Sequence, residues 1–165
     1  MAIVAADWGV TVADVRALAP QVRIVDNPAE TIPEEDGTYS LDRDRRVTVT
    51  QVESWIVDAG VMVSGEVHRW AKIKDENNVA WVTKAIKAIV AVRAAAYAVA
   101  AAFPAMAGVN DMANANAELW SRYQLDLEIL KNTVGEMVDD EKANANGMGG
   151  SFRFPRTRLP DSLRF

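Results

Sequence analysis

The chain contains no cysteine and only one histidine, and these absences limit the chemistry that it can perform. Without cysteine, disulfides, thiolate catalysis and cysteine-containing zinc sites are excluded. His68 stands beside Glu66 and Trp70 in a helical pattern with no second histidine at ligand spacing, so we expect it to be a partly exposed structural residue. The glycine-rich residues 147–150 lack the lysine of a phosphate-binding loop. The sequence therefore predicts no catalytic, cofactor-binding or metal site, and we expect no enzyme.

A long leucine-rich run that would suit a membrane is also lacking. The longest apolar stretch covers residues 88–107, but it is rich in alanine, contains Arg93 and reaches Pro104. Alanine gains little from lipid, so this stretch predicts a buried helix rather than a membrane span. The N-terminus lacks the basic segment of a secretory signal. With 165 residues, half of them hydrophobic, the chain can form one domain with a sizeable core.

Charge is unevenly distributed along the chain. The net charge is −5, yet residues 143–165 carry four arginines and one acid, so the rest of the chain is distinctly acidic. An acidic body is poorly suited to gripping the DNA backbone. A basic tail on such a body suits docking on an acidic protein partner.

Helical periodicity accounts for most of the chain and predicts an all-α fold, a small bundle of about four helices. The first helix is expected over residues 11–19, with Thr11 as its N-cap, Asp14 completing a capping box and Pro20 ending it. The first 142 residues are therefore predicted to form one helical domain with an exposed arm near the N-terminus.

The second helix is expected to begin at a capping box formed by Thr50 and Glu53. Apolar residues then recur at spacings of three and four, the period of one helix face. This stripe comprises Val52, Trp55, Ile56, Ala59, Val63, Val67 and Trp70.

The third helix, expected over residues 79–103, is apolar nearly all round after Ile89. A small monomer can hardly cover such a helix, so we expect an oligomer in which the neighbouring subunit covers one face. Trp81 and Trp120 fall off the main stripes of their helices, which suits either a subunit interface or a wide intramolecular core. The expected interface residues are Trp81, Ala94, Tyr97, Ala98 and Trp120.

The fourth helix is expected to start at an N-cap formed by Asp111 and to run to about residue 142. Its apolar stripe repeats close to every seven residues, which is too short a pattern to define a coiled coil. The stripe comprises Leu119, Tyr123, Leu127, Leu130, Val134 and Met137.

Residues 22–46 are predicted to form an arm that lies outside the helical bundle. Prolines and a glycine interrupt the segment and acids keep it solvated, while residues 38–41 favour a short strand in a small hairpin. Because Ile24, Val25, Ile32, Tyr39 and Leu41 are unusual in a free acidic loop, we expect the arm to contact a neighbouring subunit or partner. A disordered loop is the alternative.

From residue 143 the helical pattern gives way to an asparagine- and glycine-rich linker and then to an unusual tail. The tail combines phenylalanines, leucines and arginines, and its two prolines favour an extended conformation. Residues 143–165 are therefore expected to form a flexible linker and an extended docking tail.

The order of these elements resembles that of a known family. A short helix beginning Thr11-Val12-Ala13-Asp14-Val15-Arg16-Ala17-Leu18 is followed by a loop, a longer helix, an alanine-rich central helix, a last helix and a Gly-rich linker into a Phe/Arg/Pro terminus. This layout is similar to that of the adaptor, or head-completion, proteins in the head-to-tail connectors of long-tailed bacteriophages. The resemblance covers the architecture of most of the chain, although the arm is longer than the minimal family plan.

The resemblance implies a structural virion protein at the neck, or portal vertex, assembled in the host cytoplasm. Family members form a ring, usually of twelve subunits, that joins the portal to a stopper or other tail-side neck protein. The ring lines the channel for the genomic DNA, which passes without specific binding, and no membrane is involved. The C-terminal segment docks on the portal, which here implies Phe152, Arg153, Phe154, Pro155, Arg156, Arg158, Leu159, Leu163, Arg164 and Phe165. The alternative is a helical protein-binding module or regulator with a disordered basic tail.

Overall fold

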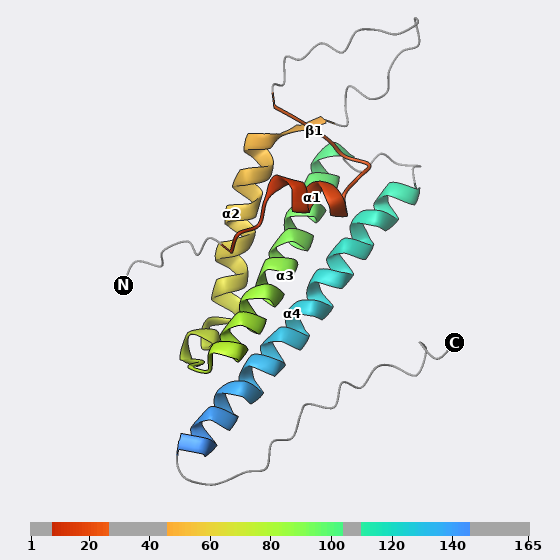
Figure 1. The fold of residues 1–165 in the computed structure, drawn as a ribbon. Coiled ribbons are helices and arrows are strands. Elements are labelled where there is room, and N and C mark those ends of the chain that lie inside the picture. Colours follow the sequence, from red (N-terminus) through yellow and green to blue (C-terminus); the bar gives the residue numbers. More distant parts are fainter. Residues whose placement is uncertain (1–7, 27–45, 104–109, 146–165) are drawn as a thin grey trace, which may run out of the picture.

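Four α-helices, a short 3-10 helix and two short strands make up the described parts of the chain in a computed structural model, which describes residues 8–26, 46–103 and 110–145 (Figure 1). In chain order the elements are α1 (Val12–Leu18), β1 (Arg23–Val25), β2 (Arg46–Thr48), α2 (Val49–Glu66), η2 (His68–Lys72), α3 (Glu76–Ala102) and α4 (Asn110–Ala145). The expected all-α bundle is confirmed.

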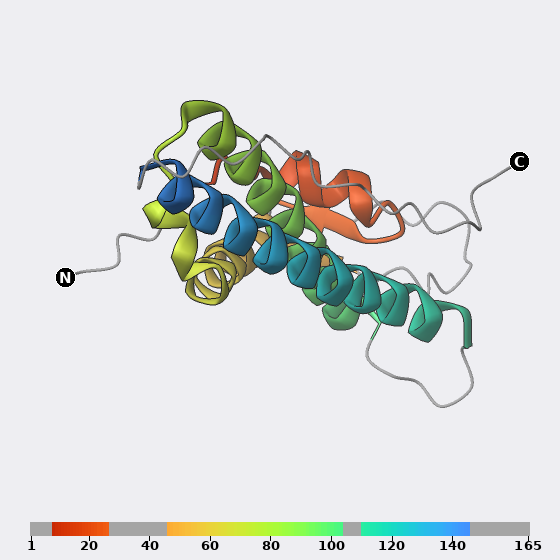
Figure 2. The same ribbon diagram turned by 90° about the horizontal axis from the view of Figure 1, so that it is seen from below.

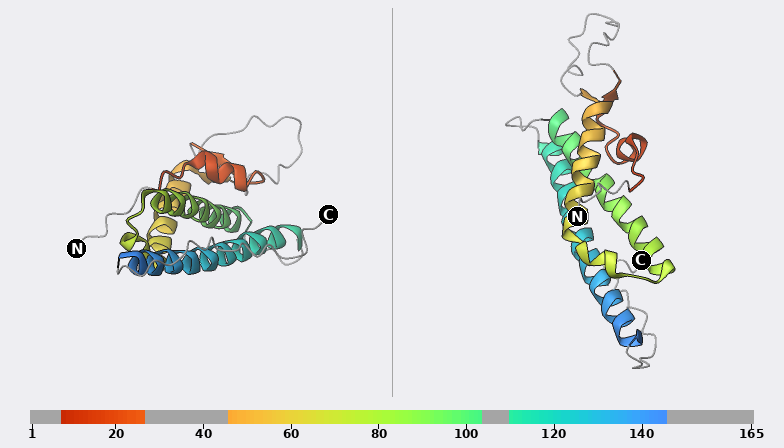
Figure 3. Two further views of the ribbon diagram at one scale, coloured as in Figure 1. Left: turned by 60° about the horizontal axis from the view of Figure 1, so that its bottom comes forward. Right: turned by 90° about the vertical axis from the view of Figure 1, so that its left-hand side faces the viewer.

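Helix α3 is the centre of the bundle. Helices α2 and α4 run antiparallel to it, and α1 and α4 lie on opposite sides of it, as the left view of Figure 3 shows. Helix α4 crosses α3 at an angle, so its N-terminal end lies well away from α2 (Figures 1 and 2). Helices α1 and α2 pack on the second half of α3, and α2 and α4 pack on its first half, while α4 also contacts the second half at Tyr97.

Helix α1 begins as the sequence predicts. The Asp14 backbone N–H donates to the Thr11 hydroxyl, and the Asp14 carboxylate accepts from the Thr11 backbone N–H at 2.8 Å. These hydrogen bonds hold the pKa of the Asp14 carboxyl below its usual value, and the charge of Lys87 on α3 adds to the effect. The capping box therefore fixes the start of α1. The Asp14 carboxylate also forms a 3.5 Å ion pair with the Lys87 ammonium, which links α1 to α3.

Helix α2 begins two residues earlier than expected. The N-cap is Thr48, whose hydroxyl accepts from the Gln51 backbone N–H while the Gln51 side chain accepts from the Thr48 backbone N–H. Thr50, the predicted cap, is inside the first turn. Two overlapping capping boxes are present in the sequence, and the helix uses the one that directly follows β2.

This cap gives a direct test with a matched control. We expect Thr48→Ala to lower the free energy of unfolding by about 0.5–2 kcal/mol, because the Gln51 N–H loses its acceptor. Thr50→Ala should change it by less than about 0.5 kcal/mol, because Thr50 is exposed and makes no cap. Urea denaturation of the two variants measures the difference, and equal losses would contradict the assignment.

Helix α3 begins three residues before its expected start. The Asp75 carboxylate caps it by accepting the backbone N–H groups of Asn77 and Asn78, each at 3.0 Å. Glu141, near the end of α4, accepts the backbone N–H groups of Lys74 and Asp75. The lower ends of α3 and α4 are therefore tied together by hydrogen bonds to backbone groups.

Much of α3 is covered within the single chain, although Trp81, Ala88, Ala100 and Ala101 remain exposed, and the expected oligomer stays a prediction. The small alanines of α3 let α1, the strands and α2 approach closely, and one core cluster joins Ala94, Ala95 and Ala98 to Val15 of α1 and Val47 of β2. A second cluster packs α2 and α4 around the first half of α3. Among the described helices α3 alone is long and apolar enough to cross a membrane, and most of that stretch is buried in the bundle.

The ends of the arm belong to the bundle. Strands β1 and β2 pair in parallel with Ile24 opposite Val47, and Val22, Val25 and Val47 are buried. Parallel strands need a long crossover, so a tight hairpin between them is not possible. The predicted strand at residues 38–41 lies outside the described residues.

Helix α4 is longer at both ends than the sequence predicts. Asp111, the expected N-cap, lies inside the helix, and the helix continues to Ala145, three residues beyond the expected domain boundary. Its predicted stripe faces the core, where Tyr123, Leu130 and Val134 are buried. Leu119, Leu127 and Met137 pack against the same core.

Candidate interaction surface

Two of the predicted interface residues meet where α4 crosses α3. The rings of Tyr97 on α3 and Trp120 on α4 pack edge to face, with centroids 5.5 Å apart. Trp120 makes a second edge-to-face contact with Tyr123, at 5.7 Å. Tyr97 and Trp120 are half-buried, and Tyr123 is buried.

Arg93 is the fourth member of this group, and the sequence analysis did not single it out as a site residue. Its Nε and Nη2 donate to the Tyr97 hydroxyl oxygen at 3.1 and 2.9 Å, and its Nη1 donates to the Tyr123 hydroxyl oxygen. The guanidinium carbon lies 4.8 Å from the Tyr123 ring centroid and 5.7 Å from that of Trp120, within cation–π range. We call Arg93, Tyr97, Trp120 and Tyr123 the Arg93 cluster.

The cluster keeps its positive charge. Burial by itself lowers the pKa of the Arg93 guanidinium, but the hydrogen bonds and partial charges of Tyr97 and Tyr123 outweigh this and raise its pKa above the usual value. Among the described residues, no carboxylate lies within ion-pair distance of Arg93. Three of its five N–H groups donate to the tyrosines, so two are left without a partner in the described part of the chain.

An ion pair between α4 and α2 lies near the Arg93 cluster. Lys131 on α4 donates to Glu66 on α2 at 2.8 Å. The hydrogen bond and charge of Lys131 lower the pKa of Glu66, and the charge of Arg93 lowers it further. Arg93 therefore acts on the Glu66 carboxylate through its charge, but that carboxylate is already paired with Lys131.

The cluster reaches the surface because the covering of α3 changes along one face. Ile86, Val90, Arg93 and Tyr97 follow at helical spacing on this face. Ile86 and Val90 are buried beneath α4, whereas Arg93 and Tyr97 are half-exposed and Ala100 is exposed. A charged and aromatic surface therefore begins where the buried apolar stripe ends.

The Tyr97 hydroxyl should contribute measurably to this contact. We expect Tyr97→Phe to lower the free energy of unfolding by about 1–2 kcal/mol, because two charged N–H groups lose their acceptor at a half-exposed site. In an Arg93→Met background the same substitution should cost clearly less, since the donors are gone. Urea denaturation of the single and double variants gives the coupling, and an unchanged cost would show that the hydroxyl acts elsewhere.

A second surface lies on the side of α2 that faces away from α3. Val57, Val61 and Met62 are 55%, 44% and 49% exposed, and Asp58 lies among them. Helix α2 contains Glu53, Asp58 and Glu66 and no lysine or arginine. We call Val57, Asp58, Val61 and Met62 the outer α2 face, which is apolar and acidic.

The other predicted interface residues are divided between core and surface. Ala94 and Ala98 are fully buried within the chain, so they are core residues that a neighbouring subunit cannot reach in this conformation. Trp81 is 46% exposed, next to the exposed Lys84 one turn along α3. All ten predicted portal-docking residues lie outside the described residues.

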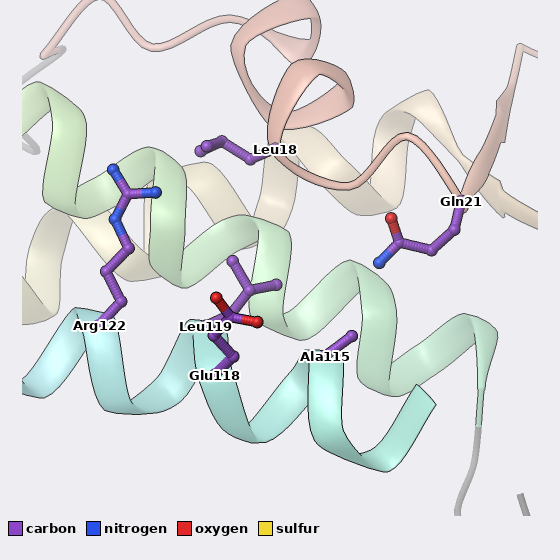
Figure 4. A pocket seen from close by; sticks show the side chains of 6 residues that line it. All are labelled: Leu18, Gln21, Ala115, Glu118, Leu119 and Arg122. Carbon is purple, nitrogen blue, oxygen red and sulfur yellow. The ribbon is translucent and has the colours of Figure 1, made fainter. Parts of the chain in front are cut away.

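One small pocket of about 210 Å³ lies between α1 and α4 (Figure 4). Its lining mixes apolar and charged side chains, namely Leu18, Gln21, Ala115, Glu118, Leu119 and Arg122. Pockets that hold small molecules usually exceed about 300 Å³. Arg122 also pairs with Asp126 at 3.6 Å, so we interpret the pocket as a surface depression.

Chemistry-bearing groups are sparse in the described parts. The residues described contain no group of three or more histidines or acids placed to hold a metal ion. His68 is exposed, but it lies in η2 at the turn between α2 and α3, because α2 ends at Glu66 rather than continuing through Trp70 as the helical pattern predicts.

Comparisons of the chain with known protein families, with curated proteins and with solved structures find no match.

Proposed function

We propose that the chain is a structural subunit of a phage head-to-tail connector, forming a ring below the portal that joins the capsid to the tail. The observation that carries the proposal is the combination of the half-buried Arg93, Tyr97 and Trp120 with exposed apolar side chains on α2, α3 and α4. Arginine, tyrosine and tryptophan dominate the energetic centres of protein interfaces. Exposed apolar patches on a small protein mark surfaces that another protein covers.

The charge distribution supports the same proposal. A net charge of −5 lets DNA pass a channel wall without adhering to it. The four arginines after residue 150 suit a contact with acidic groups of a portal. The order of the helices, from the short capped α1 to the long α4, agrees with the family resemblance of the sequence.

Native mass measurement of the chain alone and mixed with portal rings tests the proposal. We expect a complex of the portal with a ring of subunits, usually twelve in this family, whether or not the free chain is already assembled. A chain that never joins the portal, but binds duplex DNA with an affinity that falls steeply with salt, would instead be a regulator.

A further inference from the structure

We propose that neighbouring subunits contact each other head to tail, with the outer α2 face of one copy seated on the Arg93 cluster of the next. This inference rests on the proposed ring and names the surfaces that form it. It commits to one occupant of the Arg93 cluster, which is a second copy of this chain.

Charge complementarity selects these two surfaces. Arg93 keeps its charge, has two N–H groups without a partner and has no carboxylate within ion-pair distance among the described residues. The outer α2 face offers Asp58, which forms no ion pair in the described chain and lies on a helix without a basic residue. A guanidinium and a carboxylate form the strongest charge-assisted hydrogen bonds available to side chains.

Apolar complementarity points to the same pairing. Val57, Val61 and Met62 surround Asp58, and the half-exposed rings of Tyr97 and Trp120 surround Arg93. A central charge pair enclosed by apolar contacts is shielded from water, which strengthens it. Leu125 and Ile129 on α4 also flank an exposed acid, Glu128, but α4 carries Arg122 and Lys131 as well, whereas α2 contains no basic residue.

The outer α2 face and the Arg93 cluster are different surfaces in different places on the subunit, and this decides the symmetry of the contact. The outer α2 face points away from α3, because Ala59 and Val63 on the opposite side of α2 are buried against α3. The Arg93 cluster lies between α3 and α4. In a heterologous contact of this kind, each subunit uses its α2 face on one neighbour and its Arg93 cluster on the other, and the contact repeats around a ring when the rotation between neighbours closes.

Disulfide trapping in this cysteine-free chain tests the proposal directly. Val61→Cys marks the outer α2 face, and Gln124→Cys marks the exposed position next to Tyr123. We expect disulfide-linked dimers when the two single-cysteine chains are mixed at high concentration, and few when either is oxidised alone. Asn132→Cys, exposed elsewhere on α4, is the matched control and should not link to Val61→Cys.

Charge reversal at an exposed position supplies the second arm. Asp58→Lys should weaken self-association by roughly 30-fold or more, as expected for loss of one partner of an interfacial charge pair. Glu53→Lys, an equal charge change at another exposed position of α2, should leave it nearly unchanged. Because both positions are exposed, circular dichroism should show the same helical content in both variants.

The outcomes separate this inference from the proposed function. Rings that join the portal but give no link between positions 61 and 124, or as much link with position 132, overturn the head-to-tail contact and leave the connector function standing. Specific linking in a chain that never joins the portal supports the contact and overturns the connector function. A chain that remains monomeric at every concentration and on the portal, without links, overturns both.

Discussion

Truncation after Gly150 is expected to leave a folded helical body that no longer joins portal-bearing heads. The helices and core clusters lie before this point, so circular dichroism and the free energy of unfolding should hardly change. The removed segment contains Phe152, Phe154 and Phe165, each worth about 1.5–3 kcal/mol if fully buried on a partner. Its prolines lower the entropy lost on ordering.

The reach and number of the tails explain why the loss should be large. About 20 residues can span roughly 65 Å when extended, at about 3.3 Å each. Ordering a tail costs about 1–2 kcal/mol per residue, so one tail binds weakly, but a ring of tails gains from effective concentration. Sedimentation with portal-bearing heads is the measurement. A full-length chain with Phe152→Ser and Phe154→Ser is the control for length alone, and undiminished binding by the truncated chain would place docking elsewhere.

Leu130→Ala is expected to lower the free energy of unfolding more than any of the other substitutions. Leu130 is 1% exposed and packs with Val134, Val90 and Ile86 between α4 and α3. Removing its side chain loses apolar burial and leaves a cavity, which together cost about 2–5 kcal/mol.

Leu125→Ala is the matched control on the same helix. Leu125 is 59% exposed, so its replacement should change the free energy of unfolding by less than about 0.5 kcal/mol. Thermal and urea denaturation of both variants measure the difference. Similar losses at the two positions would mean that α4 presents a different face to α3.

Local signals in the sequence were sufficient for the helices themselves. The Thr11 capping box and the three-and-four spacing of the α2 stripe depend on residues close in sequence, and both are present in the structure. The start of α2 was misplaced because two local signals competed. Thr48 and Thr50 both begin a capping box, and the choice of Thr48 depends on β2, whose residues each pair with a residue 23 positions earlier in β1.

Sequence patterns did not predict the tertiary packing in two places. The composition of α3 suggested that Ala94 and Ala98 meet a neighbouring subunit, but α1 and the strands cover them within the chain, and that packing depends on the whole fold. The Arg93 cluster depends on the crossing of α3 and α4, which brings Tyr123 to a residue 30 positions earlier. The signal that was present is Arg93 itself, a charge four residues before Tyr97 in an otherwise apolar helix.

The parallel pairing of β1 with β2 separates the length of the arm from the stability of the bundle. The ladder fixes the two ends of the intervening segment side by side, so the bundle meets the same geometry for any segment between Asp26 and Arg46 that is long enough for a parallel crossover. Doubling the length of a closed loop costs only about 0.6 kcal/mol. Variants of this chain can therefore gain or lose arm residues, and with them partner preferences, at almost no cost to folding, and the same segment is the natural place to insert a label or a foreign epitope.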